Sequence, residues 1–264
     1  MPFLERVAAM SGGTQSFNCV IHGHAGSGKT TFAFSRPGVV GIPIEQGLGV
    51  LTANLFPQPR SFDEIMEMLR ELASGEHDYT GVVIDAVDGA QELIAKAVCD
   101  EHGKRSLADF GFGKGNVYAD EKWNQLLRAC DYLSKQKQIT PILISHSAAV
   151  HYDDPVAGTH VRWEPNLGKR QTPVVTAWAD IVGFLDREKA AIDKGVDGRT
   201  VRTTVATGVR RMFLDDTGSC VAKNRYGLRS ELEVPLHNGW AALEALIENA
   251  FNKAAGTADN KEAA

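Results

Sequence analysis

The sequence predicts an α/β fold: a mostly parallel sheet flanked by helices and extended by C-terminal antiparallel strands. Up to residue 180, short apolar segments alternate with amphipathic ones, which is typical of a parallel sheet covered on both faces. Beyond that point, β-rich segments are separated by turn signals, which indicates hairpins. We expect a flexible lead-in over residues 1–16, a single domain over residues 17–252 and a disordered tail over residues 253–264.

The first part of the chain contains four predicted strands and three predicted helices. The strands are FNCVIH (17–22), GVVGIPI (38–44), TGVVIDAVD (80–88) and TPILISHS (140–147). The helices cover residues 61–74, 89–101 and 121–135. The first of them opens with a serine cap, Ser61, and has Glu64 at its third position. Its apolar residues Ile65, Met68, Leu69 and Leu72 form one stripe.

The last third of the chain is richer in β-structure. Four segments read as strands, namely DIVGFL (180–185), RTVRTTVAT (199–207), VRRMFLD (209–215) and SCVAKNR (219–225). The turn signals between them are KGVDGR and DDTGS. WAALEALIENAF (240–251) is a predicted helix that closes the ordered part.

Composition excludes several classes of protein. The net charge of −5 argues against a surface coated in basic residues, although a few basic loops could still bind nucleic acid. Four widely spaced cysteines form no CxxC pair, which favours reduced core thiols over a disulfide or zinc framework. No apolar run reaches membrane-spanning length and no signal-peptide pattern is present, so we expect a cytoplasmic protein.

One glycine-rich segment predicts a phosphate-binding loop. Residues 23–30 fit the pattern G-x-x-x-x-G-K-[ST] in full, after a predicted strand and before the helix-compatible TTFAF. In such a loop the backbone amides bind phosphate oxygens, Lys29 reaches the β- and γ-phosphates and the Thr30 hydroxyl binds Mg²⁺. The predicted cofactors are therefore ATP and Mg²⁺. The expected nucleotide-binding residues are Gly23, His24, Ala25, Gly26, Ser27, Gly28, Lys29, Thr30 and Thr31.

Two carboxylates are candidates for the rest of the site. Asp85 ends a buried strand and, placed beside the loop strand, would hold Mg²⁺; the alternative is a helix cap. Ala86 follows it, so the Asp-Glu pair common in AAA+ proteins is absent, and Asp88 is expected to start the next helix. Glu45 ends the second strand and could orient the attacking water; the alternative is a surface glutamate at a turn.

These motifs, in this order, resemble those of the RecA-like phage ATPases that act as single-strand annealing proteins, a group also described as AAA-type P-loop proteins. The matching segments are GHAGSGKTT, IEQGL, VVIDAVD, ILISHS followed by HYDDP, WADIVGFL and AKNRYGL, between residues 17 and 234. The resemblance implies a RecA-like P-loop NTPase core, Glu45 as the catalytic carboxylate and His146 as the residue that senses the γ-phosphate. It also implies that Lys223 and Arg225 reach a neighbour's nucleotide within a ring or filament. The alternative for His146 is a histidine at a strand end whose hydrogen bonds are satisfied within the fold. A solvated basic edge strand is the alternative for Lys223 and Arg225.

The same resemblance implies single-stranded DNA as a partner, and two segments are candidates for the contact. Lysines and arginines could bind phosphates there and aromatic rings could stack on bases. Residues 102–121 provide Lys104, Arg105, Phe110, Phe112, Lys114 and Tyr118, and the stretch after His146 provides Arg162, Trp163, Lys169 and Arg170. We expect both to be long loops; the alternative is that the aromatic residues anchor these segments to the core.

The favoured function is an ATPase that binds single-stranded DNA and promotes annealing and recombination as a homo-oligomer, with a single-strand-binding protein as a possible partner. A phage helicase or helicase loader, a small-molecule kinase and a nucleotide-binding protein without turnover remain alternatives. The β-rich C-terminal third fits a kinase poorly, and no guanine-recognition signal supports a GTPase. The histidine spacing does not indicate zinc, and no nucleophilic triad is indicated.

Overall fold

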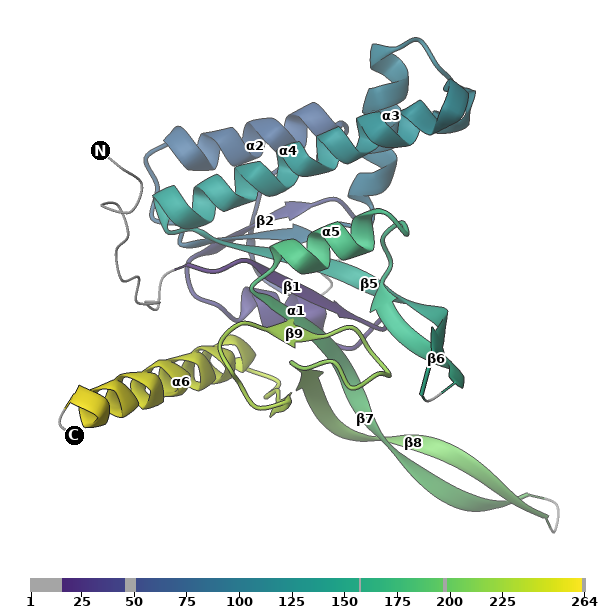
Figure 1. Cartoon of the computed structure of the whole chain (residues 1–264), viewed down its shortest axis with the longest axis vertical. Coiled ribbons are helices and arrows are strands. Elements are labelled where there is room, and N and C mark those ends of the chain that lie inside the picture. Colours follow the sequence, from purple (N-terminus) through teal and green to yellow (C-terminus); the bar gives the residue numbers. More distant parts are fainter. Residues whose placement is uncertain (1–15, 46–50, 157, 197–198, 263–264) are drawn as a thin grey trace.

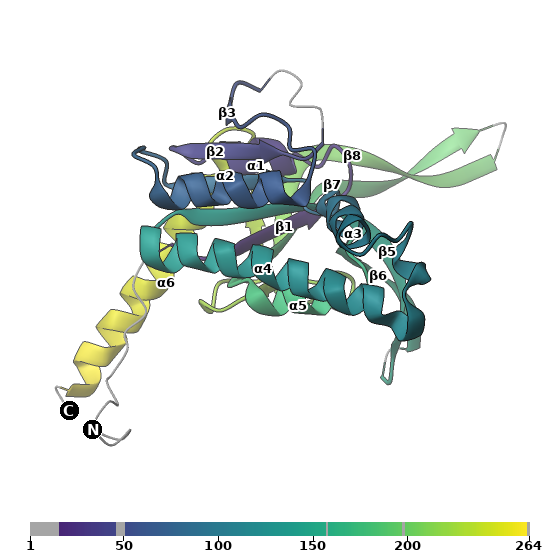
Figure 2. The ribbon, with the colours of Figure 1, turned by 90° about the horizontal axis from the view of Figure 1, so that it is seen from above.

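The computed structural model describes residues 16–45, 51–156, 158–196 and 199–262. A large sheet forms the centre of the molecule and carries helices on both faces (Figure 1, Figure 2). The predicted lead-in, except Ser16, lies outside the described residues. So do residues 46–48 of the IEQGL segment.

The described residues form ten strands. They are β1 (Cys19–Gly23), β2 (Val39–Pro43), β3 (Asn54–Leu55), β4 (Gly81–Asp85), β5 (Thr140–Asp154), β6 (Gly158–Pro165), β7 (Ile181–Val196), β8 (Arg199–Phe213), β9 (Lys223–Asn224) and β10 (Glu231–Glu233). Their order is β10-β8-β7-β1-β5-β4-β2-β3, with β6 paired to β5 and β9 to β7. The pairs from β7 to β3 are parallel, whereas β8, β10, β6 and β9 pair antiparallel. The predicted fold class is therefore confirmed.

The central position of β1 explains its apolar sequence. It lies between β5 and β7, and all five of its residues are buried. Because the strands are parallel, the carboxyl ends of β1, β2 and β4 meet at one edge of the sheet, and β5 continues past this edge to Asp154. There Gly23 of β1 lies opposite His146 of β5, and Asp85 of β4 lies opposite Ile144.

Helices cover the two faces unequally. They are α1 (Lys29–Phe34), α2 (Phe62–Ser74), α3 (Ala90–Glu101), α4 (Lys114–Lys137), α5 (Gln171–Trp178) and α6 (Gly239–Glu262), with two 3-10 turns at Leu107–Asp109 and Gly111–Gly113. In one core cluster, helices α2, α3, α4 and α5 pack against one face of the sheet. In a second cluster, α1 and α6 pack against the other face. None of the helices in the described part of the chain is long and apolar enough to cross a membrane.

The helix predicted for residues 61–74 forms as expected. The Ser61 hydroxyl accepts a hydrogen bond from the amide of Glu64 at 3.2 Å, while the Glu64 carboxylate accepts one from the amide of Arg60 at 2.6 Å. Ile65, Leu69 and Leu72 are buried, which confirms most of the predicted stripe.

The two segments that are candidates for DNA contact are largely regular structure, so the expectation that both are long loops was wrong. β5 continues to Asp154 and pairs with β6 from Ser147↔Pro165 to Asp154↔Gly158. The chain then reverses near Gly158, whose positive φ of 74° suits glycine. In the other segment, α4 begins at Lys114 instead of residue 121, directly after Gly113 in the left-handed conformation.

The C-terminal third shows two further differences. β7 and β8 are longer than predicted and form an arm that extends beyond the sheet (Figure 1). Helix α6 runs to Glu262, whereas the sequence predicts a disordered tail from residue 253. The four cysteines are buried and free, as expected.

Candidate functional site

The loop between β1 and α1 has a path that only glycine permits at two positions. Gly28 has a φ of 102°, which side chains with a Cβ rarely adopt. At Gly23 a Cβ would lie 2.1 Å from the carbonyl oxygen of Leu185 in β7. The predicted nucleotide-binding residues, 23–31, therefore form one strand–loop–helix unit at the carboxyl edge of the sheet.

Lys29 is buried at the base of this loop. Its Nζ donates hydrogen bonds to the carbonyl oxygens of Gly23 and His24, each at 3.0 Å. Burial lowers the pKa of the ammonium group, and the nearby carboxylates of Asp85, Asp88 and Glu45 oppose that shift. The loop thus holds a desolvated cation at its base, and that positive charge suits a phosphate group.

Thr30 and Asp85 meet although β4 does not neighbour β1. β5 lies between the two strands, so the expectation that the Asp85 strand is placed beside the loop strand was wrong. The Thr30 hydroxyl still donates a hydrogen bond to Asp85 Oδ2 at 2.7 Å. Burial raises the pKa of the Asp85 carboxyl, against the hydrogen bond from Thr30 and the charge of Lys29. A hydroxyl and a carboxylate are hard oxygen ligands, so this pair fits Mg²⁺.

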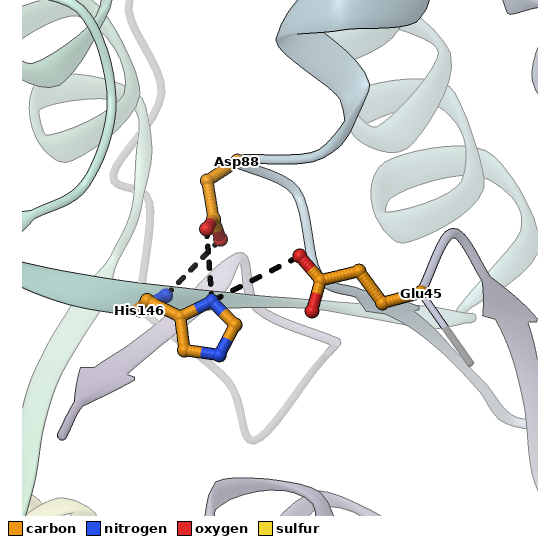
Figure 3. Close-up of side chains that lie close together, drawn as sticks. All are labelled: Glu45, Asp88 and His146. Carbon is orange, nitrogen blue, oxygen red and sulfur yellow. Dashed lines mark hydrogen bonds and ion pairs between the residues drawn. The ribbon is translucent and has the colours of Figure 1, made fainter. Parts of the chain in front are cut away.

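Three side chains at the carboxyl edge of the parallel sheet form a polar cluster: Glu45 and Asp88 follow β2 and β4, and His146 lies within β5 (Figure 3). His146 Nδ1 lies 2.9 Å from Asp88 Oδ2 and 3.9 Å from Glu45 Oε1. Asp88 Oδ1 also accepts a hydrogen bond from the His146 amide at 3.1 Å. Burial raises the pKa of the Glu45 carboxyl, and the neighbouring His146 works in the opposite direction.

Asp88 is a site residue that the sequence analysis missed. The sequence analysis expected it only to start the next helix, but the cap position of α3 is Gly89 and the Asp88 carboxylate bonds to His146. A histidine near the end of one predicted strand and an aspartate that follows another were the available signal, because parallel strands bring such positions together.

One cavity of about 990 Å³ connects the loop with this cluster. Its lining includes Lys29, Thr30, Asp85, Glu45 and His146, which the sequence predicted as site residues. It also includes Arg187 and Arg210 from β7 and β8, which the sequence analysis did not single out. The site therefore draws on segments from both ends of the domain.

Lys223 and Arg225 contact their own chain. Lys223 Nζ donates hydrogen bonds to the carbonyl oxygens of Thr176 and Ala177, at 2.8 and 3.0 Å. Arg225 donates to the Ala177 carbonyl at 2.9 Å and to Asp180 at 2.8 Å. Both side chains thus bind the C-terminal end of α5, and neither lines the cavity of its own chain.

The first DNA-binding candidate segment divides into buried and exposed residues. Phe110 is buried and packs against His102 and Tyr118, with ring centroids 5.3 and 5.6 Å apart, so it anchors the segment to the core and is not available to stack on a base. Phe112, by contrast, is fully exposed at 105 %. Lys104, Arg105 and Lys114 are also exposed, and within the described residues none of them forms an ion pair.

The second candidate segment is engaged mainly in internal contacts. Arg162 forms an ion pair with Asp216 and lies over the ring of Tyr152, 5.0 Å from its centroid. Trp163 is half-buried and packs edge-on against His24 of the phosphate loop at 4.2 Å. Arg170 forms an ion pair with Asp120, which leaves Lys169 as the exposed candidate without an ion pair within the described part of the chain.

The fold and the site together define a nucleotide-binding protein with a phosphate loop on a parallel sheet. The chain belongs to the AAA domain family, whose model matches residues 16–226, and so carries an AAA-type P-loop ATPase domain. A comparison with curated proteins finds no match. Among solved structures, the RadB recombinase is similar at 15 % identity and a TM-score of 0.47, with 85 % of this chain and 89 % of that chain covered.

Proposed function

We propose that the chain binds and hydrolyses ATP, binds single-stranded DNA and promotes strand annealing in homologous recombination, as the phage annealing proteins it resembles do. The observation that carries the proposal is the composition of one cavity. Lys29, Thr30 and Asp85 suit a metal-bound triphosphate, and Glu45 and His146 lie at the same edge of the sheet.

Each of these residues has a role that follows from its position. Lys29 binds the β- and γ-phosphates, while Thr30 and Asp85 hold Mg²⁺, which shields the phosphate charge when bound. Glu45 accepts a hydrogen bond from the attacking water and orients it, and desolvation makes its carboxylate a stronger base. His146, held by Asp88, senses the γ-phosphate from the part of β5 that lies opposite Gly23.

The turn between α3 and α4 supports the DNA-binding part of the proposal. It projects at the edge of the molecule (Figure 1). Phe112 is exposed in this part of the chain, and so are the cationic side chains of Lys104, Arg105 and Lys114. Lys114 is the first residue of α4, where the helix dipole disfavours a cation. A cation kept there at a cost in stability is consistent with a phosphate-binding role.

The proposal includes assembly into a ring or filament, in which Lys223 and Arg225 act on a neighbour's nucleotide. Both contact the same carbonyl group, that of Ala177, so the two cations act at one point on the surface. To reach a neighbour they exchange these acceptors for a phosphate. A single-strand-binding protein is a further proposed partner, and the host cytoplasm is the proposed location for a phage-encoded chain.

The deciding experiment measures ATP hydrolysis by the full chain with and without single-stranded DNA, with particle size followed in parallel. We expect DNA to stimulate hydrolysis and to accompany larger particles. Lys29→Ala should abolish ATP binding or turnover, because it removes the buried cation of the phosphate loop. Hydrolysis unchanged by Lys29→Ala would refute the site, and ATP-driven unwinding of duplex DNA would favour a helicase.

A further inference from the structure

Two arginines on the β7–β8 arm face the nucleotide cavity from directly opposite positions. Arg187 of β7 is the cross-strand partner of Arg210 in β8, and both line the cavity. The next pair on the same face of the strands, Leu185 and Met212, is buried in the core that also contains α1. Because side chains alternate along a strand, the two arginines continue the face of the sheet that carries α1 and its phosphate loop.

Neither guanidinium group has a carboxylate partner within 4 Å in the described part of the chain. Arg210 Nε is in addition buried and makes no hydrogen bond. Like charges directly opposite one another destabilise a sheet, and an unsatisfied buried donor adds to that cost. Arg211, the next residue of β8, behaves differently: it pairs with Glu188 at 2.8 Å and with Glu231 at 3.5 Å.

Arg210 also lies against the phosphate loop itself. A Cβ built on Gly28 would be 2.9 Å from Arg210 Nε and 3.4 Å from Cζ. Gly28 directly precedes Lys29, so the guanidinium group lies at the segment of the loop that the motif assigns to phosphate contact. The pairing of β7 with β8 shifts register between Arg187 and Lys189, opposite Gly208, which has a positive φ. The strands are therefore irregular directly beside the arginine pair.

We propose that Arg187 and Arg210 bind the phosphate chain of the nucleotide held by the same chain. The assignment rests on the proposed function, since it needs a nucleotide in the cavity. It accounts for two cations that lack a carboxylate partner among the described residues, because a polyphosphate supplies the negative charge and the acceptors that both guanidinium groups need. It also gives the arm a role in closing the site in cis, separate from the trans role proposed for Lys223 and Arg225.

Calorimetric titration of the full chain tests this assignment with Mg²⁺-ADP, AMP and adenosine as probes. Arg187→Gln, Arg210→Gln and the double variant are compared with Arg211→Gln, which removes a cation from the opposite face of the same strand. We expect the affinity for ADP to fall about tenfold for each single variant and about a hundredfold for the double variant. The affinity for AMP should fall less, and that for adenosine should stay the same.

Thermal unfolding separates a binding role from a structural one. Without nucleotide, the double variant should unfold at the same temperature as the wild type or higher, because it loses a like-charge pair. The stabilisation produced by ADP should shrink. Wild-type ADP affinity in the double variant, alongside lost binding in Lys29→Ala, would overturn the arginine assignment alone. Failure of the wild type to bind ADP would overturn the proposed function as well.

Discussion

At the scale of single residues, His22 makes the stability of β1 depend on pH. The ring is completely buried, and its Nε2 lies 2.6 Å from the carbonyl oxygen of Val221. A carbonyl only accepts hydrogen bonds, so Nε2 carries the proton and Nδ1 of the neutral ring accepts from the Ser147 hydroxyl at 2.8 Å. Burial lowers the pKa of His22 to about 4.

Acidification should therefore destabilise the fold. The unfolded chain binds a proton at His22 below about pH 6.5, whereas the folded chain resists it down to about pH 4. Between these values the free energy of unfolding falls as pH falls, by about 2 kcal/mol from this group between pH 6.5 and pH 5. Denaturant unfolding of the wild type and of His22→Gln, carried out between pH 6.5 and pH 5, measures this change in the free energy of unfolding. Parallel curves for the two proteins would contradict the assignment.

Glu45 is the residue whose chemical role is most directly testable. Glu45→Gln keeps the size of the side chain and removes its charge, so Mg²⁺-ATP should still bind while turnover falls by about a hundredfold or more. Single-turnover hydrolysis and nucleotide affinity, measured on the same preparation, separate the two effects. Asp63→Asn, on an exposed position of α2, is the matched control. If Glu45→Gln hydrolysed ATP at the wild-type rate, Glu45 would be a surface glutamate at a turn and not the residue that orients the attacking water.

What the sequence could predict at this scale follows from how far apart the partners lie along the chain. The phosphate loop is a contiguous pattern, so Gly23 to Thr31 could be assigned from spacing alone. Asp88 and Arg210 could not be assigned in this way. Asp88 bonds to His146, which lies 58 residues further along the chain, and Arg210 lies against Gly28 of the phosphate loop. Nothing local distinguishes Arg210 from Arg211, although only Arg211 has carboxylate partners in the described chain.

At the scale of elements, helix α5 is capped by the side chains that the resemblance assigns to a neighbour's nucleotide. Replacing both Lys223 and Arg225 by alanine should lower the free energy of unfolding by about 1 kcal/mol, because it removes cations from the negative end of a helix. It should leave nucleotide binding intact and lower turnover in the assembled state. Arg229→Ala, which removes an exposed cation elsewhere, is the control.

The two effects are measured separately. Denaturant unfolding measures how much the two side chains stabilise helix α5. ATP turnover per folded chain, compared between dilute and assembling protein concentrations, measures their action on a neighbour's nucleotide. A stability loss with equal turnover at every concentration would leave the pair as a helix cap only.

Strand ends were harder to predict than strand cores. The buried apolar segments of β1, β4 and the first half of β5 were recognisable because a strand covered on both faces reads as a continuous apolar run. Residues 147–165 were not, because most side chains of β5 and β6 in this hairpin are exposed or only half-buried and its sequence contains charged and small residues. Only pairing with β6 makes it a strand, and pairing between exposed segments leaves a weak sequence signal.

At the scale of the whole molecule, strand order determines which side chains meet. With β5 between β1 and β4, His146 comes next to both Gly23 and the segment that follows Asp85. A sequence read segment by segment predicts the strands but not their order in the sheet. The expectation that the Asp85 strand neighbours the loop strand was wrong for this reason.

The same arrangement connects the nucleotide cavity to the proposed DNA surface through one helix. Asp88, which holds His146, lies immediately before α3, and the turn with Phe112 and Lys114 follows the far end of that helix. Twelve helical residues span about 18 Å. A change at His146 on γ-phosphate binding or loss can therefore reach this turn as a displacement of a rigid element.

This connection predicts that DNA binding and hydrolysis can be uncoupled from the DNA side. Phe112→Ala with Lys114→Ala should weaken binding of single-stranded DNA by about tenfold to a hundredfold, because it removes a stacking ring and a phosphate contact. Hydrolysis without DNA should stay at the wild-type rate, while stimulation by DNA is lost. Fluorescence anisotropy with a labelled oligonucleotide, read beside steady-state turnover, measures both, with Lys135→Ala near the far end of α4 as the control. Wild-type DNA affinity in the double variant would exclude this turn as the DNA surface. Weakened binding with intact stimulation would mean that the signal travels by another route than α3.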